Sequence, residues 1–312
     1  MSDVIYNKNT PVLFLIFNRP DTTAKVFEEI RKAKPQRLYL SADGPRTPEE
    51  ESVCEQTRKI SLDINWDCEV FTNFSTHNKG CKVAMSEGIT WFFQQEEEGI
   101  ILEDDCLPSE SFFGFCSSLL AHYRHDRRIT HIGGSNLQCG QVRGNASYYF
   151  SNLTHVWGWA GWRRVWKTYD VDLSSFPTFK EQEYINNCPS HYPFKEGWLE
   201  ALEKTYEGKI DTWDYQYAYA NLVNNGLSVI PNSNLISNIG FGTQATHTFD
   251  ADHIYSAVLN EEITSIKHPQ FIIPHVQADI FTQEKESYVA PVKKKTIFSR
   301  SWKSFKSTIR KN

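Results

Sequence analysis

Three consecutive carboxylates, Glu103, Asp104 and Asp105, follow a short apolar run at residues 99–102. An apolar run of this length, bounded by glycine and proline, is typical of a buried strand. Because carboxylates are costly to bury without cations or several hydrogen bonds, we expect them where the strand leaves the sheet. Open α/β sheets bind ligands there, and hard oxygen ligands suit Mg²⁺ or Mn²⁺ carrying a diphosphate. The alternative is a solvated loop or the first turn of the following helix, where carboxylates are also favoured.

Polar residues also follow two other predicted strands. Asn18 and Arg19 come after the apolar residues 11–17, and Asp43 comes after residues 37–42, so we expect them at one edge of the sheet. The Arg19 guanidinium offers a planar fork of donors to a diphosphate, and together with Asp43 it could bind a nucleotide. Both residues could equally be ordinary turn or surface residues.

Two lysines, Lys79 and Lys82, lie in a polar loop just before a predicted helix at residues 83–95. A helix N-terminus is a natural phosphate site, so both are candidates for binding the diphosphate. The lysines alone do not decide between this role and a surface position.

Four tryptophans occur within residues 157–166, interrupted by Gly158 and Gly161. The glycines favour a flexible aromatic loop over a periodic helix face, and Trp faces commonly stack on sugar rings. We therefore expect an acceptor site, although the same residues could belong to the core. The candidate acceptor residues are Trp157, Trp159 and Trp162.

Two further residues are candidates for the chemistry itself. Asp214 begins a predicted helix near residues 213–224, where an acid usually caps the helix and could instead act as a general base. His247 lies in the glycine-containing segment 240–248, which is typical of a mobile lid, although a surface histidine is the commoner case.

Strands and helices alternate through residue 134, which predicts an α/β fold with a mainly parallel sheet covered on both faces. Beyond it we expect a strand at residues 148–153, then helices and another strand. The expected later elements are helices near 179–187, 194–207 and 213–224 and a strand at 227–230. The predicted organisation is a main domain at 1–250, an extension wrapped on it at 251–290 and a basic tail at 291–312.

The net charge of −5 hides an asymmetry, because residues 291–312 carry eight Lys or Arg and no acid. The remaining 290 residues are near −13 (−5 minus 8), so a nucleic-acid-binding body is not expected. In the tail, four apolar residues recur at helical spacing between the cations. This pattern predicts an amphipathic basic helix on an anionic membrane surface, with a disordered solvated tail as the alternative. The four residues are Phe298, Trp302, Phe305 and Ile309.

The seven cysteines are scattered and contain no C-x-x-C pair, which fits reduced thiols better than a disulfide framework or a zinc cage. No apolar run approaches the roughly 20 residues that span a bilayer, and residues 1–11 lack a signal-peptide core. We therefore expect a cytoplasmic protein, with peripheral contact to the inner membrane face through the tail.

The order of these motifs over residues 11–250 resembles the GT-A glycosyltransferases, and most closely N-acetylglucosaminyltransferase I and its bacterial relatives. The motifs in question are Asn-Arg19, Ser-Ala-Asp43-Gly, Ile-Leu-Glu-Asp-Asp105, the Gly/Trp segment 157–162, Trp-Asp214, and Phe241-Gly with Thr-His247.

The resemblance implies a role for each matching residue. Arg19 and Asp43 would hold the nucleotide, with Asp43 at the uracil edge. Glu103 and Asp104 would face the ribose and donor sugar, and Asp105 would bind Mn²⁺ or Mg²⁺. Asp214 would deprotonate the acceptor hydroxyl, and the loop around His247 would close over the donor. The chain departs from the family in two ways. The family's paired acids after Trp become Asp214-Tyr215 here. In addition, we expect no counterpart of the amino-terminal membrane anchor of the Golgi relative.

The working hypothesis is a metal-dependent, inverting GT-A glycosyltransferase that moves a sugar from a nucleotide-diphosphate donor, expected to be a UDP-sugar, to a hydroxyl. The expected acceptor is a surface glycan or its lipid-linked precursor. One rival is a sugar-1-phosphate nucleotidyltransferase, a class that usually has a glycine-rich loop after the first strand, whereas residues 17–21 contain no glycine. The other rival is a non-catalytic nucleotide-sugar-binding protein.

Overall fold

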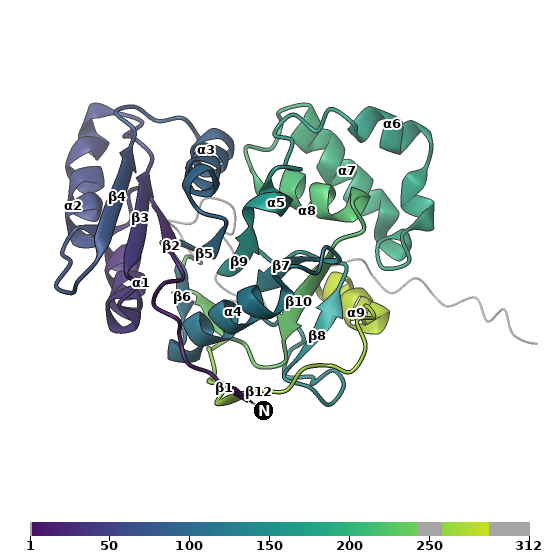
Figure 1. The fold of residues 1–312 in the computed structure, drawn as a ribbon. Coiled ribbons are helices and arrows are strands. Elements are labelled where there is room, and N and C mark those ends of the chain that lie inside the picture. The colour runs from purple at the N-terminus through teal and green to yellow at the C-terminus, as the bar shows by residue number, and fades with distance from the viewer. Residues whose placement is uncertain (1, 242–257, 287–312) are drawn as a thin grey trace, which may run out of the picture.

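A computed structural model describes residues 2–241 and 258–286 of the chain (Figure 1). Its centre is an eight-stranded sheet with the strand order β4-β3-β2-β5-β9-β7-β10-β8. The strands of this sheet are β2 (Val12–Ile16), β3 (Arg37–Ala42), β4 (Glu69–Phe74), β5 (Glu98–Glu103), β7 (Ile129–Gly133), β8 (Tyr148–Ser151), β9 (Trp159–Trp162) and β10 (Leu227–Pro231).

The sheet is mainly parallel, which confirms the predicted α/β class. Strands β2, β3, β4 and β5 pair in parallel, as do β7 and β10, whereas β9 and β8 run antiparallel to their neighbours. Strand β2 is buried along its whole length, as expected for a central strand covered on both faces.

Helices flank the sheet in two groups. Helix α1 packs against α2 and α4, while α3 packs on β2 and β3 and reaches α5. These helices are α1 (Pro20–Ala33), α2 (Glu51–Ser61), α3 (Cys81–Gln95), α4 (Glu110–Tyr123) and α5 (Arg163–Trp166). Helix α1 starts with Pro20, whose fixed φ suits a first helical position, and ends at Lys34 in the left-handed region (φ 54°).

A helical insert with its own apolar cluster lies between β9 and β10 in the chain. Its elements are α6 (Phe176–Glu181), the 3₁₀ turns Tyr184–Asn187 and Tyr192–Phe194, α7 (Lys195–Tyr206) and α8 (Asp214–Val223). The single helix predicted at 179–187 is wrong, because α6 ends at Glu181 and Glu183 takes a left-handed conformation (φ 53°) before the 3₁₀ turn.

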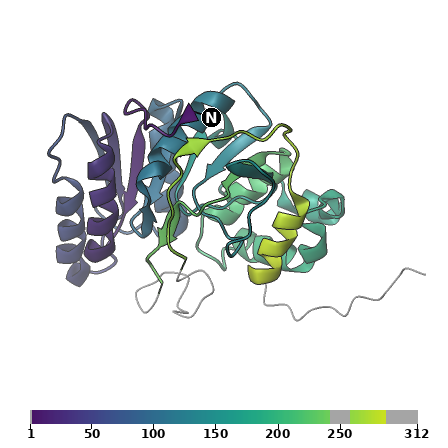
Figure 2. The same ribbon diagram turned by 90° about the horizontal axis from the view of Figure 1, so that it is seen from below.

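The described part of the extension, residues 258–286, lies against the main body. Strand β12 (Ser265–Ile266) pairs with β1 (Ser2–Asp3) next to the N-terminus (Figure 2). Helix α9 (Val276–Glu286) buries Asp279, whose carboxylate accepts hydrogen bonds from the hydroxyls of Ser151 (2.5 Å) and Ser190 (2.6 Å). Asp279 thereby ties α9 to the edge strand β8 and to the helical insert.

Three further expectations concern the chain as a whole. All seven cysteines lie in the described part, and all seven are free thiols there. Among the described residues, no helix is long and apolar enough to cross a membrane. The basic tail at 291–312 lies outside the described residues.

Two buried histidines predict a stability that depends on pH. Burial lowers the pKa of His131 from 6.5 to about 3 and that of His191 from 6.5 to about 4. Below pH 6.5 each of these two imidazoles therefore binds a proton in the unfolded chain but not in the folded chain, which lowers the free energy of unfolding by roughly 2 kcal/mol per histidine at pH 5. Buried carboxyls whose pKa is raised by burial, such as Asp104 (to about 7), contribute with the opposite sign, so the histidine contribution is read from a variant. Urea titrations of the wild type and of a histidine variant at pH 7 and pH 5 measure this contribution. The His191→Phe variant should lose less between these two pH values, and the surface control His125→Gln should match the wild type. An equal loss in His191→Phe would contradict this assignment.

Candidate active site

Arg19 and the acidic triplet meet where two neighbouring parallel strands end. Strands β2 and β5 pair with Leu15 opposite Glu103, so the residues that follow each strand lie side by side. The Arg19 guanidinium donates to Asp104 (2.9 Å) and to Asp105 (2.9 Å), forming one fork across two carboxylates. The backbone N–H of Phe17 also donates to Asp104 (3.3 Å). Arg19 and the acidic triplet therefore lie together at one edge of the sheet, as predicted.

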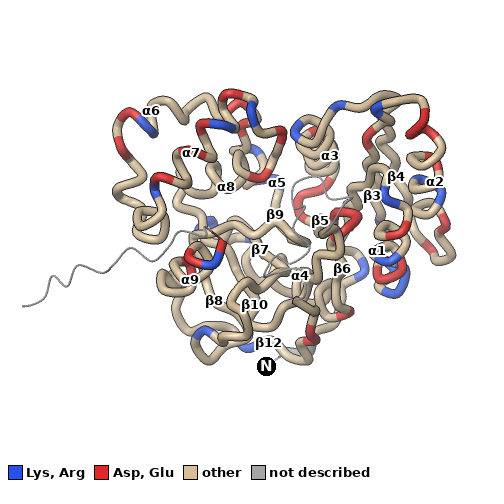
Figure 3. Tube along the Cα trace, turned by 180° about the vertical axis from the view of Figure 1, so that it is seen from behind, with Lys and Arg blue, Asp and Glu red and all other residues tan. Residues whose placement is uncertain are grey.

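The carboxylates of this cluster are strongly perturbed. Burial raises the pKa of Asp104 to about 7, although the neighbouring Arg19 cation lowers it. Burial, then the charges of Asp105 and Asp104, raise the pKa of Glu103 well above its ordinary value. Three carboxylates therefore share one cation, so the site favours additional positive charge when all three are ionised. Figure 3 shows acidic residues in red where β5 ends.

The acidic cluster suits a divalent ion that is held together with a ligand. Asp105 uses Oδ2 for the ion pair with Arg19, and its Oδ1 lies 3.5 Å from the Cys106 thiol. In the part of the chain that the structure describes, no three His, Cys, Asp or Glu side chains are arranged to hold a metal alone. Mg²⁺ is commonly bound by one or two carboxylates plus substrate phosphates, so Asp105 fits a site that a diphosphate would complete.

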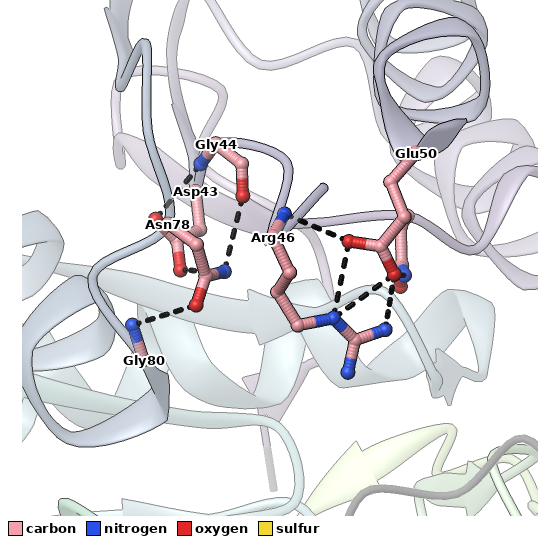
Figure 4. Close-up of polar contacts among 7 residues, drawn as sticks. Asp43, Gly44, Arg46, Glu50, Asn78 and Gly80 are labelled. Carbon is pink, nitrogen blue, oxygen red and sulfur yellow. Dashed lines mark hydrogen bonds and ion pairs between the residues drawn. The ribbon is translucent and has the colours of Figure 1, made fainter. Parts of the chain in front are cut away.

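Asp43 follows β3 and organises the loop that leads into α3 (Figure 4). Its carboxylate accepts from the backbone N–H groups of Gly44 (2.8 Å) and Lys79 (3.0 Å) and from the Asn78 amide (2.8 Å). Burial raises the pKa of Asp43, and these backbone donors lower it. Asp43 therefore fixes the loop at residues 78–80, and its predicted contact with a base stays a prediction.

Asn18 turns away from the acidic cluster. Its amide donates to Glu50 (3.2 Å), which also pairs with the Arg46 guanidinium (Figure 4). The Arg46 guanidinium lies over the Phe17 ring at 5.3 Å. Asn18 thus stabilises the loop after β3, and its predicted part in binding the nucleotide-sugar stays a prediction.

The helix N-terminus beside Lys79 and Lys82 is already capped by an acid, and the predicted binding of the diphosphate by the two lysines stays a prediction. The Asp211 carboxylate accepts from the first N–H groups of α3, at Cys81 (2.9 Å) and Lys82 (3.0 Å). The lysine side chains are engaged elsewhere, Lys79 with Glu87 (2.6 Å) and Lys82 near Asp172 (3.9 Å). An anion therefore already occupies this helix N-terminus, and it belongs to the chain itself.

Asp214 is the first residue of α8, and its charge acts on the acidic cluster. Its carboxylate accepts from the Thr212 hydroxyl and from the backbone N–H of Tyr215 (2.9 Å). Its charge is one of the groups that raise the pKa of Glu103. Asp214 is therefore an acid in the first turn of a helix, which was the alternative to a general base. Its negative charge also acts on the acidic cluster.

The expectation that Trp159 and Trp162 form a flexible acceptor-binding loop is wrong. Both belong to strand β9 in the middle of the sheet and are 1% and 2% exposed. Trp159 stacks on Trp213 (6.1 Å between ring centroids), the residue before Asp214, and so supports the start of α8. Trp157 differs, because it is half-buried and packs edge-on against Phe241 (5.8 Å).

Two residues near the site were not predicted. Gly240 follows β11 (Ile236–Asn238), which pairs with β6 (Cys106–Pro108), and a Cβ on Gly240 would lie 2.3 Å from the Asp105 carboxylate. The other is Asp211, which lies in the loop before α8 and accepts from the N-terminus of α3. Gly240 could have been found from the sequence, because it begins the glycine-containing segment 240–248. No local pattern indicates that Asp211 contacts α3. His247 lies outside the described residues.

No family model and no curated protein matches the chain. Among solved structures it is similar to HddC from Yersinia pseudotuberculosis, with 11% identity, TM-score 0.33, and 51% of this chain and 80% of the other covered. It is also similar to UDP-glucose pyrophosphorylase in complex with UDP-glucose, with 13% identity, TM-score 0.32, and 51% and 78% covered. A third is 4-diphosphocytidyl-2C-methyl-D-erythritol synthase from Anaerococcus prevotii DSM 20548, with 11% identity, TM-score 0.32, and 55% and 78% covered. None of these three bears the name of an N-acetylglucosaminyltransferase, and at such scores the similarities say nothing about the activity of this chain.

Proposed function

We propose that the chain is a GT-A glycosyltransferase that transfers a sugar from a nucleotide-diphosphate donor, a UDP-sugar, to a hydroxyl group with inversion. The observation that carries this proposal is the cluster of Arg19, Asp104 and Asp105 at the ends of β2 and β5, within the electrostatic reach of Asp214. In this proposal, Arg19 and an ion bound by the carboxylates would balance the charge of the diphosphate, and Asp214 would be a separate carboxylate for the acceptor.

The proposed reaction is a single displacement. The acceptor oxygen forms a bond to the anomeric carbon while the bond from that carbon to the diphosphate oxygen breaks. The acceptor proton passes to the Asp214 carboxylate, and the electron pair of the broken bond leaves with the nucleoside diphosphate. Asp214 suits the role because one of its oxygens, Oδ1, is fixed by Thr212 and Tyr215, which orients the carboxylate.

Mn²⁺ or Mg²⁺ bound at Asp105 would neutralise the charge that develops on the leaving diphosphate. The Arg19 guanidinium contacts two of the carboxylates, so it lies next to the proposed ion site, where it would also be available to the diphosphate. Asp43 would bind the nucleotide from the neighbouring strand end.

A sugar-1-phosphate nucleotidyltransferase is the second candidate. Such enzymes usually bind phosphates with a glycine-rich loop after the first strand. Here that loop, residues 17–21, has no glycine, and its arginine is directed at carboxylates. These features favour glycosyl transfer. A nucleotide-sugar-binding protein without turnover would share the donor contacts but would have no need of Asp214.

We also propose that the acceptor is a surface glycan or a lipid-linked precursor. The support is the basic amphipathic pattern at residues 291–312, which suits contact with an anionic membrane.

Incubation with a panel of UDP- and GDP-sugars, with and without Mn²⁺, separates the three candidates. Release of UDP that depends on Mn²⁺ and an acceptor supports the glycosyltransferase. Formation of a nucleotide sugar and pyrophosphate from a nucleoside triphosphate and a sugar 1-phosphate would replace it with the nucleotidyltransferase. Donor binding in calorimetry without turnover on any acceptor tried would favour the binding protein.

A further inference from the structure

We propose that Asp211 is a positioning residue that holds the Asp214 carboxylate in place by clamping the loop before α8 to the N-terminus of α3. The inference rests on the proposed function, because it assigns Asp211 a part in the transfer through Asp214. It joins two segments that lie 130 residues apart in the chain.

The first half of the clamp is the contact with α3. The Asp211 carboxylate accepts from Cys81 N–H through Oδ2 (2.9 Å) and from Lys82 N–H through Oδ1 (3.0 Å), so both oxygens are used. The geometry is that of a helix cap provided by a distant residue, and the negative charge is favoured by the helix dipole. Gly80 makes room for it, because a Cβ there would lie 2.8 Å from Oδ2.

The second half lies in the residues just after Asp211. The Thr212 hydroxyl donates to Asp214, and the Trp213 ring stacks on Trp159 in the centre of the sheet. The Tyr169 hydroxyl donates to the Trp213 carbonyl (3.3 Å). The Asp214 backbone is therefore fixed on one side by the aromatic core and on the other by Asp211.

The clamp also fixes the loop between Asp43 and α3. The loop at residues 78–82 donates backbone N–H groups to two carboxylates, from Lys79 to Asp43 and from Cys81 and Lys82 to Asp211. Loss of the Asp211 contacts should therefore release the end of this loop at α3, while Asp43 keeps the other end in place. Misplacement of a catalytic group by about 1 Å can cost about 10²-fold in rate, so this contact is expected to matter for turnover.

The test compares Asp211→Ala, Asp211→Asn and the control Asp172→Ala, which removes an exposed acid near Lys82. UDP release is measured with the UDP-sugar that the wild type turns over, and UDP binding with Mn²⁺ by calorimetry. Asp211→Ala should lower kcat by about 10- to 100-fold, with the Kd for UDP changed less than about twofold. Asp211→Asn should recover part of the loss, because its amide oxygen still accepts one of the two bonds, and Asp172→Ala should match the wild type.

A double-mutant comparison decides whether Asp211 acts through Asp214. In an Asp214→Asn background, Asp211→Ala should add little further loss, since the group that it positions is gone. A full additional loss there, or a raised KM with normal kcat, would overturn the positioning role.

Amide hydrogen exchange of peptides covering 78–86 and 209–217 provides a readout that does not depend on glycosyl transfer. Both peptides should exchange faster in Asp211→Ala, and unchanged exchange would refute the clamp itself. If Asp214→Asn leaves the rate of the wild-type reaction unchanged, the proposed base is wrong. In that case the positioning role of Asp211 is overturned, whereas faster exchange in Asp211→Ala would still support the contact between the two segments.

Discussion

The Asp214→Asn variant is expected to transfer sugar about 10²- to 10⁴-fold more slowly than the wild type, the usual contribution of a general base. An acceptor hydroxyl has a very high pKa, and an amide cannot take its proton as the glycosidic bond forms. Asparagine keeps an oxygen that can accept from Thr212 and Tyr215, so the start of α8 should stay folded. The measurement is kcat for UDP release, together with the Kd for UDP, which should change little.

The control for this experiment is Asp172→Asn, the same substitution at an exposed position of the helical insert. It should leave kcat unchanged. An unaltered rate in Asp214→Asn would move the base to another residue, and a product that keeps the anomeric configuration of the donor would refute the inverting mechanism.

The Asp105→Asn variant should lose turnover that depends on Mn²⁺. The substitution removes the charge of the residue that we propose as the metal ligand, and it weakens the contact of Arg19 (2.9 Å) on a carboxylate that is only partly exposed. Titration of UDP release against Mn²⁺ measures the effect, and circular dichroism with a melting curve reports whether the fold is kept.

Asp63→Asn is the matched control, because Asp63 pairs with Arg31 on the surface with 74% of its side chain exposed. Surface pairs of this kind contribute about 0–1 kcal/mol, so activity and melting temperature should stay close to those of the wild type. Near-normal activity of Asp105→Asn in Mn²⁺ would show that the ion is bound elsewhere or is not used.

The part of the site that could be predicted from the sequence depends on local patterns. The apolar runs that became β2 and β5 end in polar residues, and parallel strands bring their carboxyl ends to one edge. The contact of Arg19 with Asp104 and Asp105 follows from that topology. The start of α8 at Asp214 was likewise visible in the sequence.

The tryptophans could not be placed in this way. Gly158 and Gly161 suggested a flexible loop, but Gly161 pairs with Gly99 across β9 and β5, where small residues leave room for the aromatic rings packed around them. That pairing joins segments about sixty residues apart, and burial of Trp159 depends on Trp213, just before α8, and on Tyr217 within it. Only the assembled sheet determines which face of each ring is covered.

The acid at the lysine loop was missed for a similar reason. Its sequence shows two cations before a helix, which is a correct description of the local charge. The decisive group, Asp211, is contributed by a loop far along the chain, and no periodicity connects the two segments.

The position of β9 has a consequence for how the chain is made. This strand separates β5 from β7, although it is synthesised after both, so the two parallel parts of the sheet cannot be joined until residues 159–162 have been made. Until then β5 presents an unpaired edge on a growing polypeptide, and exposed strand edges are sites of intermolecular pairing. Late, non-local strand insertion is also slow, because loop closure precedes the contacts that stabilise it. A ribosome-bound chain that stops before β9 should therefore be the form of this protein most dependent on chaperones.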